Sequence, residues 1–188
     1  MKSSSAQSVF RTLFSGSFNI VTNLISNQNI LLVKDKDPLY QKVTALNRSI
    51  KRALEDSNYL EAKNLVSELF TIADQFQGNW HYDNLIHLGY SYAGLIALEE
   101  GNIEIARESL LLAINIKASP QIKSFGPNMA LAEKLLELGE KQVVLKYLKL
   151  CKKLWFFPFG FFNLRRWKKM VKADQMPNFG FNKIAHMH

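Results

Sequence analysis

The residue types that most often perform catalysis or bind metals are few and scattered in this sequence. His81 and His87 lie six residues apart, and His186 and His188 lie at the end of the chain. A spacing of six points two side chains in different directions on a straight helix, so we expect no metal site from this pair. The single cysteine, Cys151, cannot form an internal disulfide. It is expected to be a small core residue in a reducing compartment.

Sequence motifs of the common enzyme classes are also absent. The chain has no paired CxxC, no HExxH, no glycine-rich phosphate loop and no GxSxG nucleophile elbow. We therefore predict no catalytic residue, no metal and no cofactor, and a protein that is not an enzyme.

Cationic residues gather near the C-terminus. Residues 141–188 hold eleven Lys or Arg and one acid, Asp174, a net charge of +10. The whole chain carries +8, so the first 140 residues carry −2. A chain polarised in this way favours an anionic partner or surface at one end.

Two basic sets flank an aromatic run, WFFPFGFF, at residues 155–162. Before the run, Lys146, Lys149 and Lys153 are spaced as one exposed helical stripe, opposite an inward face. That inward face is expected to hold Val144, Tyr147, Leu148 and Cys151. After the run come Arg165, Arg166, Lys168 and Lys169. Nucleic acid is not the expected partner, because the rings are contiguous rather than spread along a groove and no nucleic-acid motif is present.

The elements that position these residues are predicted to be helices, since strand-forming alternation is nearly absent. Turns are expected near Ser57, Gly101 and Gly139, and Asn102 can cap the helix after the second turn. Pro120 is expected to end that helix. Ala106 is expected to be buried where two helices approach closely.

Residues 90–120 resemble the tetratricopeptide repeat. Aligned on the central glycine, the signature positions hold Tyr90, Ala93, Gly94, Ala97, Gly101, Ala106, Leu110 and Ala113. Tyr90 replaces the usual Trp, and Ala97 replaces the usual aromatic residue of the first helix. Flanking units place Ala62 and Val144 at the position of Ala106, at spacings longer than the repeat period of about 34. The resemblance implies an all-α fold of antiparallel helical hairpins, stacked as a short tetratricopeptide-like right-handed solenoid.

The stretch from Ser119 to Trp155, together with the later MPNFG, is also similar to a group of small bacterial proteins of this kind of fold. The similarity covers roughly residues 85–180, its specific part is the block SFGPNM, and it carries no catalytic residue. In that block Phe125 is expected to be a buried plug, and Gly126 to take an unusual backbone angle. Pro127 is expected in the first helical turn, with Asn128 satisfying free amides there.

The sequence divides into three parts, 1–37, 38–155 and 156–188. In the first part, residues 8–26 have the pattern of an amphipathic helix, followed by the linker VKDKDP, whose proline favours a new helix start. In the last part, Pro158 and Gly160 should break the helix, and a new helix is expected over 163–173. MPNFGFNKIAHMH is expected to be a polar, frayed end. Whether 8–26 and 156–162 pack on the core, on a partner or on a membrane is left open.

Neither the uninterrupted apolar run of a secretory signal, about seven to fifteen residues, nor the about twenty of a membrane span is present. A cytoplasmic location follows as the expectation, with a peripheral position at the inner membrane as the alternative.

Stacked helical hairpins usually serve recognition, so the predicted function is a protein interaction module, an adaptor or scaffold with an acidic protein partner. The alternatives are a peripheral adaptor that binds anionic lipid through the aromatic and basic tail, and an inhibitor or immunity-type binder of another protein. The predicted binding residues in the groove are Tyr82, His87, Tyr90, Arg107 and Asn128, in addition to the seven cations named above.

Overall fold

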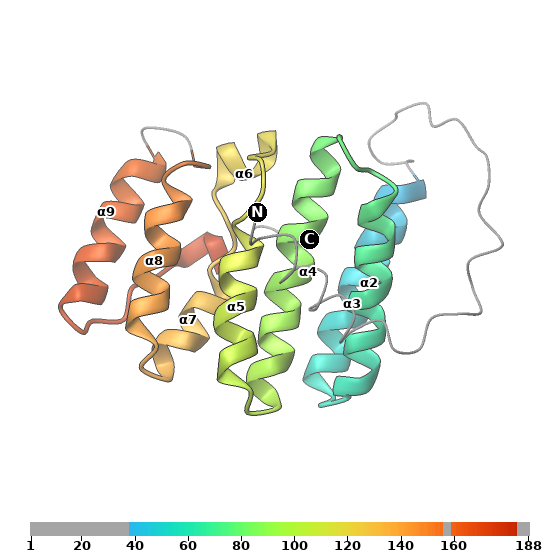
Figure 1. Cartoon of the computed structure of the whole chain (residues 1–188), viewed down its shortest axis with the longest axis horizontal. Coiled ribbons are helices and arrows are strands. Elements are labelled where there is room, and N and C mark those ends of the chain that lie inside the picture. The colour runs from blue at the N-terminus through green and yellow to red at the C-terminus, as the bar shows by residue number, and fades with distance from the viewer. Residues whose placement is uncertain (1–37, 156–158, 184–188) are drawn as a thin grey trace. The chain divides into compact units, whose positions relative to one another are not determined.

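The structure is a computed structural model, and it describes residues 38–155 and 159–183. Within these residues the chain forms eight α-helices, one short 3₁₀ helix and no strand (Figure 1). The prediction of an all-helical protein is therefore confirmed for the described residues. The amphipathic helix predicted over 8–26 lies outside the described residues. The chain divides into two units, Met1–Ser67 and Glu68–His188, and the division falls within one helix.

The first unit contains α2, Pro38–Glu55, and the beginning of α3, Tyr59–Asp74. Pro38 begins α2, as its fixed φ favours. The predicted turn is confirmed at Ser57, which takes a left-handed backbone conformation with φ 55°. The buried apolar side chains of this unit are Leu46, Ile50, Ala53, Ala62 and Val66.

The second unit begins with the end of α3 and continues into a helical hairpin, α4, Trp80–Glu99, and α5, Ile103–Ala113. Gly101 reverses the chain between them with φ 76°. The Asn102 side chain accepts a hydrogen bond from the Ile105 amide at 3.1 Å, which confirms the predicted cap. The two helices lie side by side along their length (Figure 1).

Small residues permit the close packing of this hairpin. Ala106 is completely buried, as predicted. A Cβ atom on Gly94 would lie 3.0 Å from the Ser109 Cβ and 2.3 Å from a methyl carbon of Leu131. Because Ser109 belongs to α5 and Leu131 to the later helix α7, Gly94 lets α4 approach both helices closely.

The helix predicted to end at Pro120 ends earlier, at Ala113. Pro120 instead occupies the first turn of a separate short helix, α6, Pro120–Phe125. The Ser119 hydroxyl caps that helix by accepting a hydrogen bond from the Ile122 amide at 3.0 Å. The proline lacks only an N–H that a first turn does not use, so it starts a helix here rather than ending one.

The SFGPNM block connects α6 to α7, Ala130–Glu137, and two of its predicted roles are wrong. Phe125 is 53% exposed and not a plug, and Pro127 precedes the first turn of α7. Gly126 does take an unusual conformation, with φ 81° and ψ 169°. The Asn128 side chain accepts a hydrogen bond from the Ala130 amide at 2.8 Å, as predicted.

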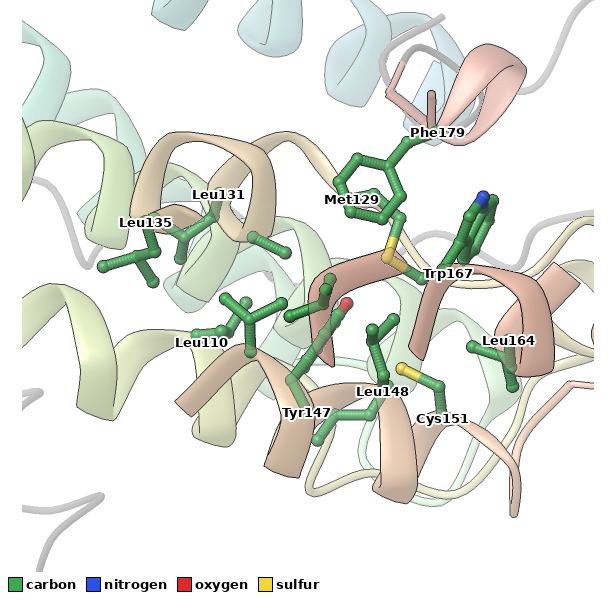
Figure 2. Packing of buried hydrophobic residues seen from close by; sticks show 14 of the residues in the cluster. Leu110, Met129, Leu131, Leu135, Tyr147, Leu148, Cys151, Leu164, Trp167 and Phe179 are labelled. Atoms are coloured by element: carbon green, nitrogen blue, oxygen red, sulfur yellow. The ribbon is translucent and has the colours of Figure 1, made fainter. Parts of the chain in front are cut away.

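A second hairpin follows, in which Gly139, with φ 81°, joins α7 to α8, Lys141–Cys151. In this unit α7 contacts α4, α5 and α8, and α8 contacts α9, Phe159–Lys172. Side chains from α4, α5, α7, α8 and α9, together with Phe179 after α9, form one hydrophobic cluster (Figure 2).

Helix α8 ends at Cys151 and α9 begins at Phe159, so the two are separate helices. Gly160 does not break a helix, because it lies within α9. A Cβ atom there would lie 2.6 Å from the Trp155 ring, so glycine allows α9 to approach that indole. After α9 comes the terminal segment, residues 175–183, which ends in the 3₁₀ helix Gly180–Lys183. Its Phe179 is buried, so the expectation of a frayed end is wrong for residues 176–183.

Candidate functional site: a cationic surface beside a hollow

Helix α9 separates an apolar side from a charged side. Leu164, Trp167 and Val171 recur at spacings of three and four and are buried. The other side of α9 is called here the cationic face. It consists of Phe161, Phe162, Arg165, Arg166, Lys168, Lys169 and Lys172, of which only Lys168 is half-buried rather than exposed. Helix α9 contains no acidic residue, so this face carries five positive charges.

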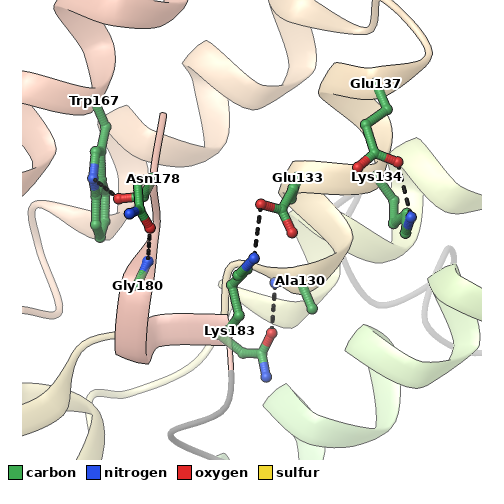
Figure 3. A network of polar contacts seen from close by, with 9 residues as sticks. Ala130, Glu133, Lys134, Glu137, Trp167, Asn178, Gly180 and Lys183 are labelled. Carbon is green, nitrogen blue, oxygen red and sulfur yellow. Dashed lines mark hydrogen bonds and ion pairs between the residues drawn. The ribbon is translucent and has the colours of Figure 1, made fainter. Parts of the chain in front are cut away.

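Trp167 fixes the orientation of α9. Its ring centroid lies 5.7 Å from that of Trp155 and 5.0 Å from that of Phe179, with the second pair nearly edge-to-face. The indole N–H donates a hydrogen bond to the Asn178 carbonyl at 3.2 Å (Figure 3). Since Trp167 is almost fully buried between these partners, the cationic face is held outward by the core.

Charge on the cationic face is not neutralised locally. Within residues 38–155 and 159–183, none of its five cations forms an ion pair. Asp174, the acid nearest in sequence, accepts instead from the Lys141 ammonium at 2.7 Å. That ammonium also donates to the Lys172 carbonyl at 3.0 Å. The face therefore keeps a field that attracts anions.

Helix α8 and the turn that follows it contribute the second basic set, with Lys153 in the turn because α8 ends at Cys151. Lys146, Lys149 and Lys153 are exposed, as the spacing predicted. The opposite residues Val144, Tyr147, Leu148 and Cys151 are completely buried, also as predicted. Burial raises the pKa of the Cys151 thiol, so it stays protonated and is a poor nucleophile.

A hollow of about 430 Å³ lies between α9 and the terminal segment. Arg166 and Met170 line it from α9, and Phe179 and Phe181 line it from the terminal segment. Arg166 belongs to both the hollow and the cationic face, so the two features are continuous.

Three of the predicted groove residues do not line a surface. His87, Tyr90 and Asn128 are at most 3% exposed. His87 Nε2 accepts a hydrogen bond from the Asn128 amide at 2.9 Å, because an amide N–H can only donate. Its Nδ1 therefore carries the proton and donates to the Ala113 carbonyl at 2.8 Å. The predicted position of these side chains in an open groove is corrected: the side chains of His87 and Asn128 bond to buried backbone groups, and the Tyr90 ring packs against Phe70, with 4.9 Å between ring centroids.

The other two predicted groove residues are accessible. Tyr82 is half-buried, and the Arg107 side chain is 36% exposed. The Arg107 guanidinium donates hydrogen bonds to both Glu140 oxygens and to Glu104. The hydrogen bond to Glu140 raises the pKa of Arg107 and lowers the pKa of Glu140. Arg107 thus joins α5 to the start of α8 and is already engaged within the fold.

Sequence reasoning missed the terminal segment, which forms one wall of the hollow. The Asn182 side chain donates to the Phe125 carbonyl at 2.7 Å, and the Asn182 backbone carbonyl accepts from the Met129 amide at 2.9 Å. Lys183 forms an ion pair with Glu133 of α7 at 3.1 Å (Figure 3). The signal in the sequence was the apolar Phe179 within this segment, whose ring the fold buries.

This arrangement can bind anions through cations that form no ion pair with the described part of the chain, and apolar groups through exposed rings. Within the residues described, no group of three or more His, Cys, Asp or Glu is placed to hold a metal ion. No helix in those same ranges combines the length and the apolar character needed to cross a bilayer. Comparisons of the chain with protein-family models, curated proteins and solved structures found no match.

Proposed function

We propose that this protein is a non-enzymatic interaction module that binds an acidic protein partner through the cationic face of α9. The observation that carries the proposal is a helix with five cations and no acid, held outward by its buried side. An acidic partner surface would supply the missing counter-charges, accelerate encounter and select against basic proteins.

The helical hairpins α4–α5 and α7–α8 support this proposal as a scaffold. Each hairpin turns at a glycine with positive φ, and α7 contacts both helices of the first hairpin. We interpret this arrangement as a short tetratricopeptide-like solenoid, an architecture in which packed hairpins present extended binding surfaces. A cytoplasmic adaptor or an inhibitor of another protein would use such a surface in the same way.

The experiment that tests the proposal places a photo-crosslinking phenylalanine analogue at position 162 of the full chain, in its native lysate. Phe162 lies on the cationic face and is 62% exposed. Position 125 is the matched control, because Phe125 is 53% exposed and lies on α6. We expect an adduct with an acidic protein from position 162 and none from position 125.

Charge variants then test whether the adduct depends on the cationic face. Arg165→Gln with Lys169→Gln should abolish it. Arg48→Gln with Lys123→Gln removes the same charge from exposed positions elsewhere and should leave it unchanged. An adduct that survives the first pair of substitutions, or one that forms equally from both crosslinking positions, contradicts the proposal.

An anionic bilayer is the second candidate, favoured by the exposure of Phe161 and Phe162, 37% and 62%, beside the cations. Interfacial helices insert a broad apolar face, however, and the apolar side of α9 is already buried in the protein. Flotation with phosphatidylcholine vesicles, with and without phosphatidylserine, separates the candidates. Binding that requires phosphatidylserine and weakens with salt would favour the membrane.

A further inference from the structure

The hollow beside the cationic face has a lining that is partly apolar and partly polar. Met170 of α9 and Phe179 and Phe181 of the terminal segment are its apolar lining residues, beside Trp167. Its polar lining residues are Asn163, Arg166, Asn178 and Asn182. Phe181 is 63% exposed, so a large apolar surface lies at the edge of the hollow. Thioether and aromatic groups together accommodate bulky apolar side chains of varied shape.

The walls of the hollow are held in place before any partner arrives. On one side Trp167 donates to the Asn178 carbonyl, and the Asn178 side chain accepts from the Gly180 amide at 2.9 Å. On the other side Asn182 bonds to the loop between α6 and α7, through the Phe125 carbonyl and the Met129 amide. A preformed site avoids part of the entropic cost of ordering a loop on binding.

We propose that the hollow receives one bulky apolar side chain from an acidic, extended segment of the partner protein. This inference rests on the proposed function and specifies the partner. Arg166 lies at the hollow and on the cationic face, so it can bind a carboxylate next to the inserted side chain. The segment then continues along α9, where its other carboxylates meet Arg165 and Lys169.

The spacing of the cations suits an extended segment. Arg165 and Lys169 are four residues apart on a helix, a rise of about 6 Å along its axis. Alternate residues of an extended chain are about 6.6 Å apart and point to the same side. Acids at alternate positions of the partner segment can therefore bind successive cations of α9.

The test is fluorescence anisotropy of the full chain with a labelled peptide, Glu-Glu-Phe-Glu-Glu-Glu, and with the same peptide carrying Ala in place of Phe. Both peptides have the same charge, so their affinity ratio reports the apolar side chain alone. We expect the Phe peptide to bind about tenfold more tightly. Phe181→Ala should reduce this ratio by about threefold or more. Phe125→Ala, the exposed-ring control on α6, should leave the ratio unchanged.

The outcomes separate this inference from the proposed function. Equal affinity of the two peptides for the native chain overturns the inference, and if that binding still weakens with salt, the cationic face keeps its role. Binding of neither peptide counts against both. Arg165→Gln with Lys169→Gln should weaken the binding of both peptides by the same factor. A loss of affinity for the Phe peptide alone would also overturn the assignment of its ring to the hollow.

Discussion

Gly126→Ala should destabilise the second unit severely, and its cost can be worked out from two separate effects. Gly126 has φ 81° and ψ 169°, a region that residues with a Cβ atom adopt at a cost of about 1–3 kcal/mol. The new Cβ would also lie 2.5 Å from the Trp155 indole and 2.8 Å from the Asn182 amide nitrogen. Overpacking of this kind costs about 1–3 kcal/mol. Together they predict a loss of about 2–6 kcal/mol in the free energy of unfolding.

Urea denaturation followed by tryptophan fluorescence measures this loss. Gly139→Ala is the matched control, because Gly139 has the same φ of 81° but no atom within 4 Å of the position of a Cβ. It should lose only the backbone contribution, about 1–2 kcal/mol.

A second background isolates the clash. In a chain that already carries Trp155→Ala, the additional cost of Gly126→Ala should be smaller than in the native background, because the indole that the Cβ meets is gone and only the backbone cost and the contact with Asn182 remain. If Gly126→Ala and Gly139→Ala are equally destabilising in the native background, Trp155 does not pack on Gly126 and the reasoning is refuted.

Three further predictions concern polar and buried groups. His87→Leu should lower the free energy of unfolding by about 1–3 kcal/mol in urea titrations, because the Asn128 amide would be buried without an acceptor; a neutral effect would contradict the assigned hydrogen bond. Arg107 lowers the pKa of Glu140, so this ion pair stabilises the folded chain above the usual pKa of a glutamate, 4.5. That stabilisation should be lost as the pH falls below 4.5. Arg107→Gln should therefore flatten the acid limb of stability against pH, and an unchanged limb would exclude this coupling. Cys151 should not react with a thiol reagent in the native chain and should react in denaturant, since it is fully buried with a raised pKa; rapid native labelling would show that α8 opens.

Much of the local structure could be predicted because it depends on residues close in sequence. The cap formed by Asn102 and the turn at Gly101 involve only neighbouring residues, and the structure contains both. The exposure of Lys146 and Lys149 opposite the buried side of α8 follows from the helical period alone, whereas Lys153 lies in the turn after that helix. The candidate cationic surface was likewise visible as an excess of Lys and Arg.

Other predictions failed where a local pattern allowed two outcomes. Pro120 could end one helix or begin another, and Ser119, which caps the following turn, favours the beginning. Phe125 was expected in the core because of its apolar side chain. Its side chain is instead largely exposed, at 53%, and its backbone carbonyl accepts a hydrogen bond from Asn182.

By itself, then, the sequence determined the helical class, the turns and the charge of the C-terminal part, since helical period, caps and net charge depend on residues within a few positions. Only the tertiary structure decided that the terminal segment packs inward, that His87 is buried and that a hollow lies beside α9. These features depend on contacts such as Asn182 with Phe125, 57 residues apart, and Asn128 with His87, 41 apart. The local sequence around each of these residues does not specify its distant partner, because many other surfaces could accept the same hydrogen bonds or pack against the same rings.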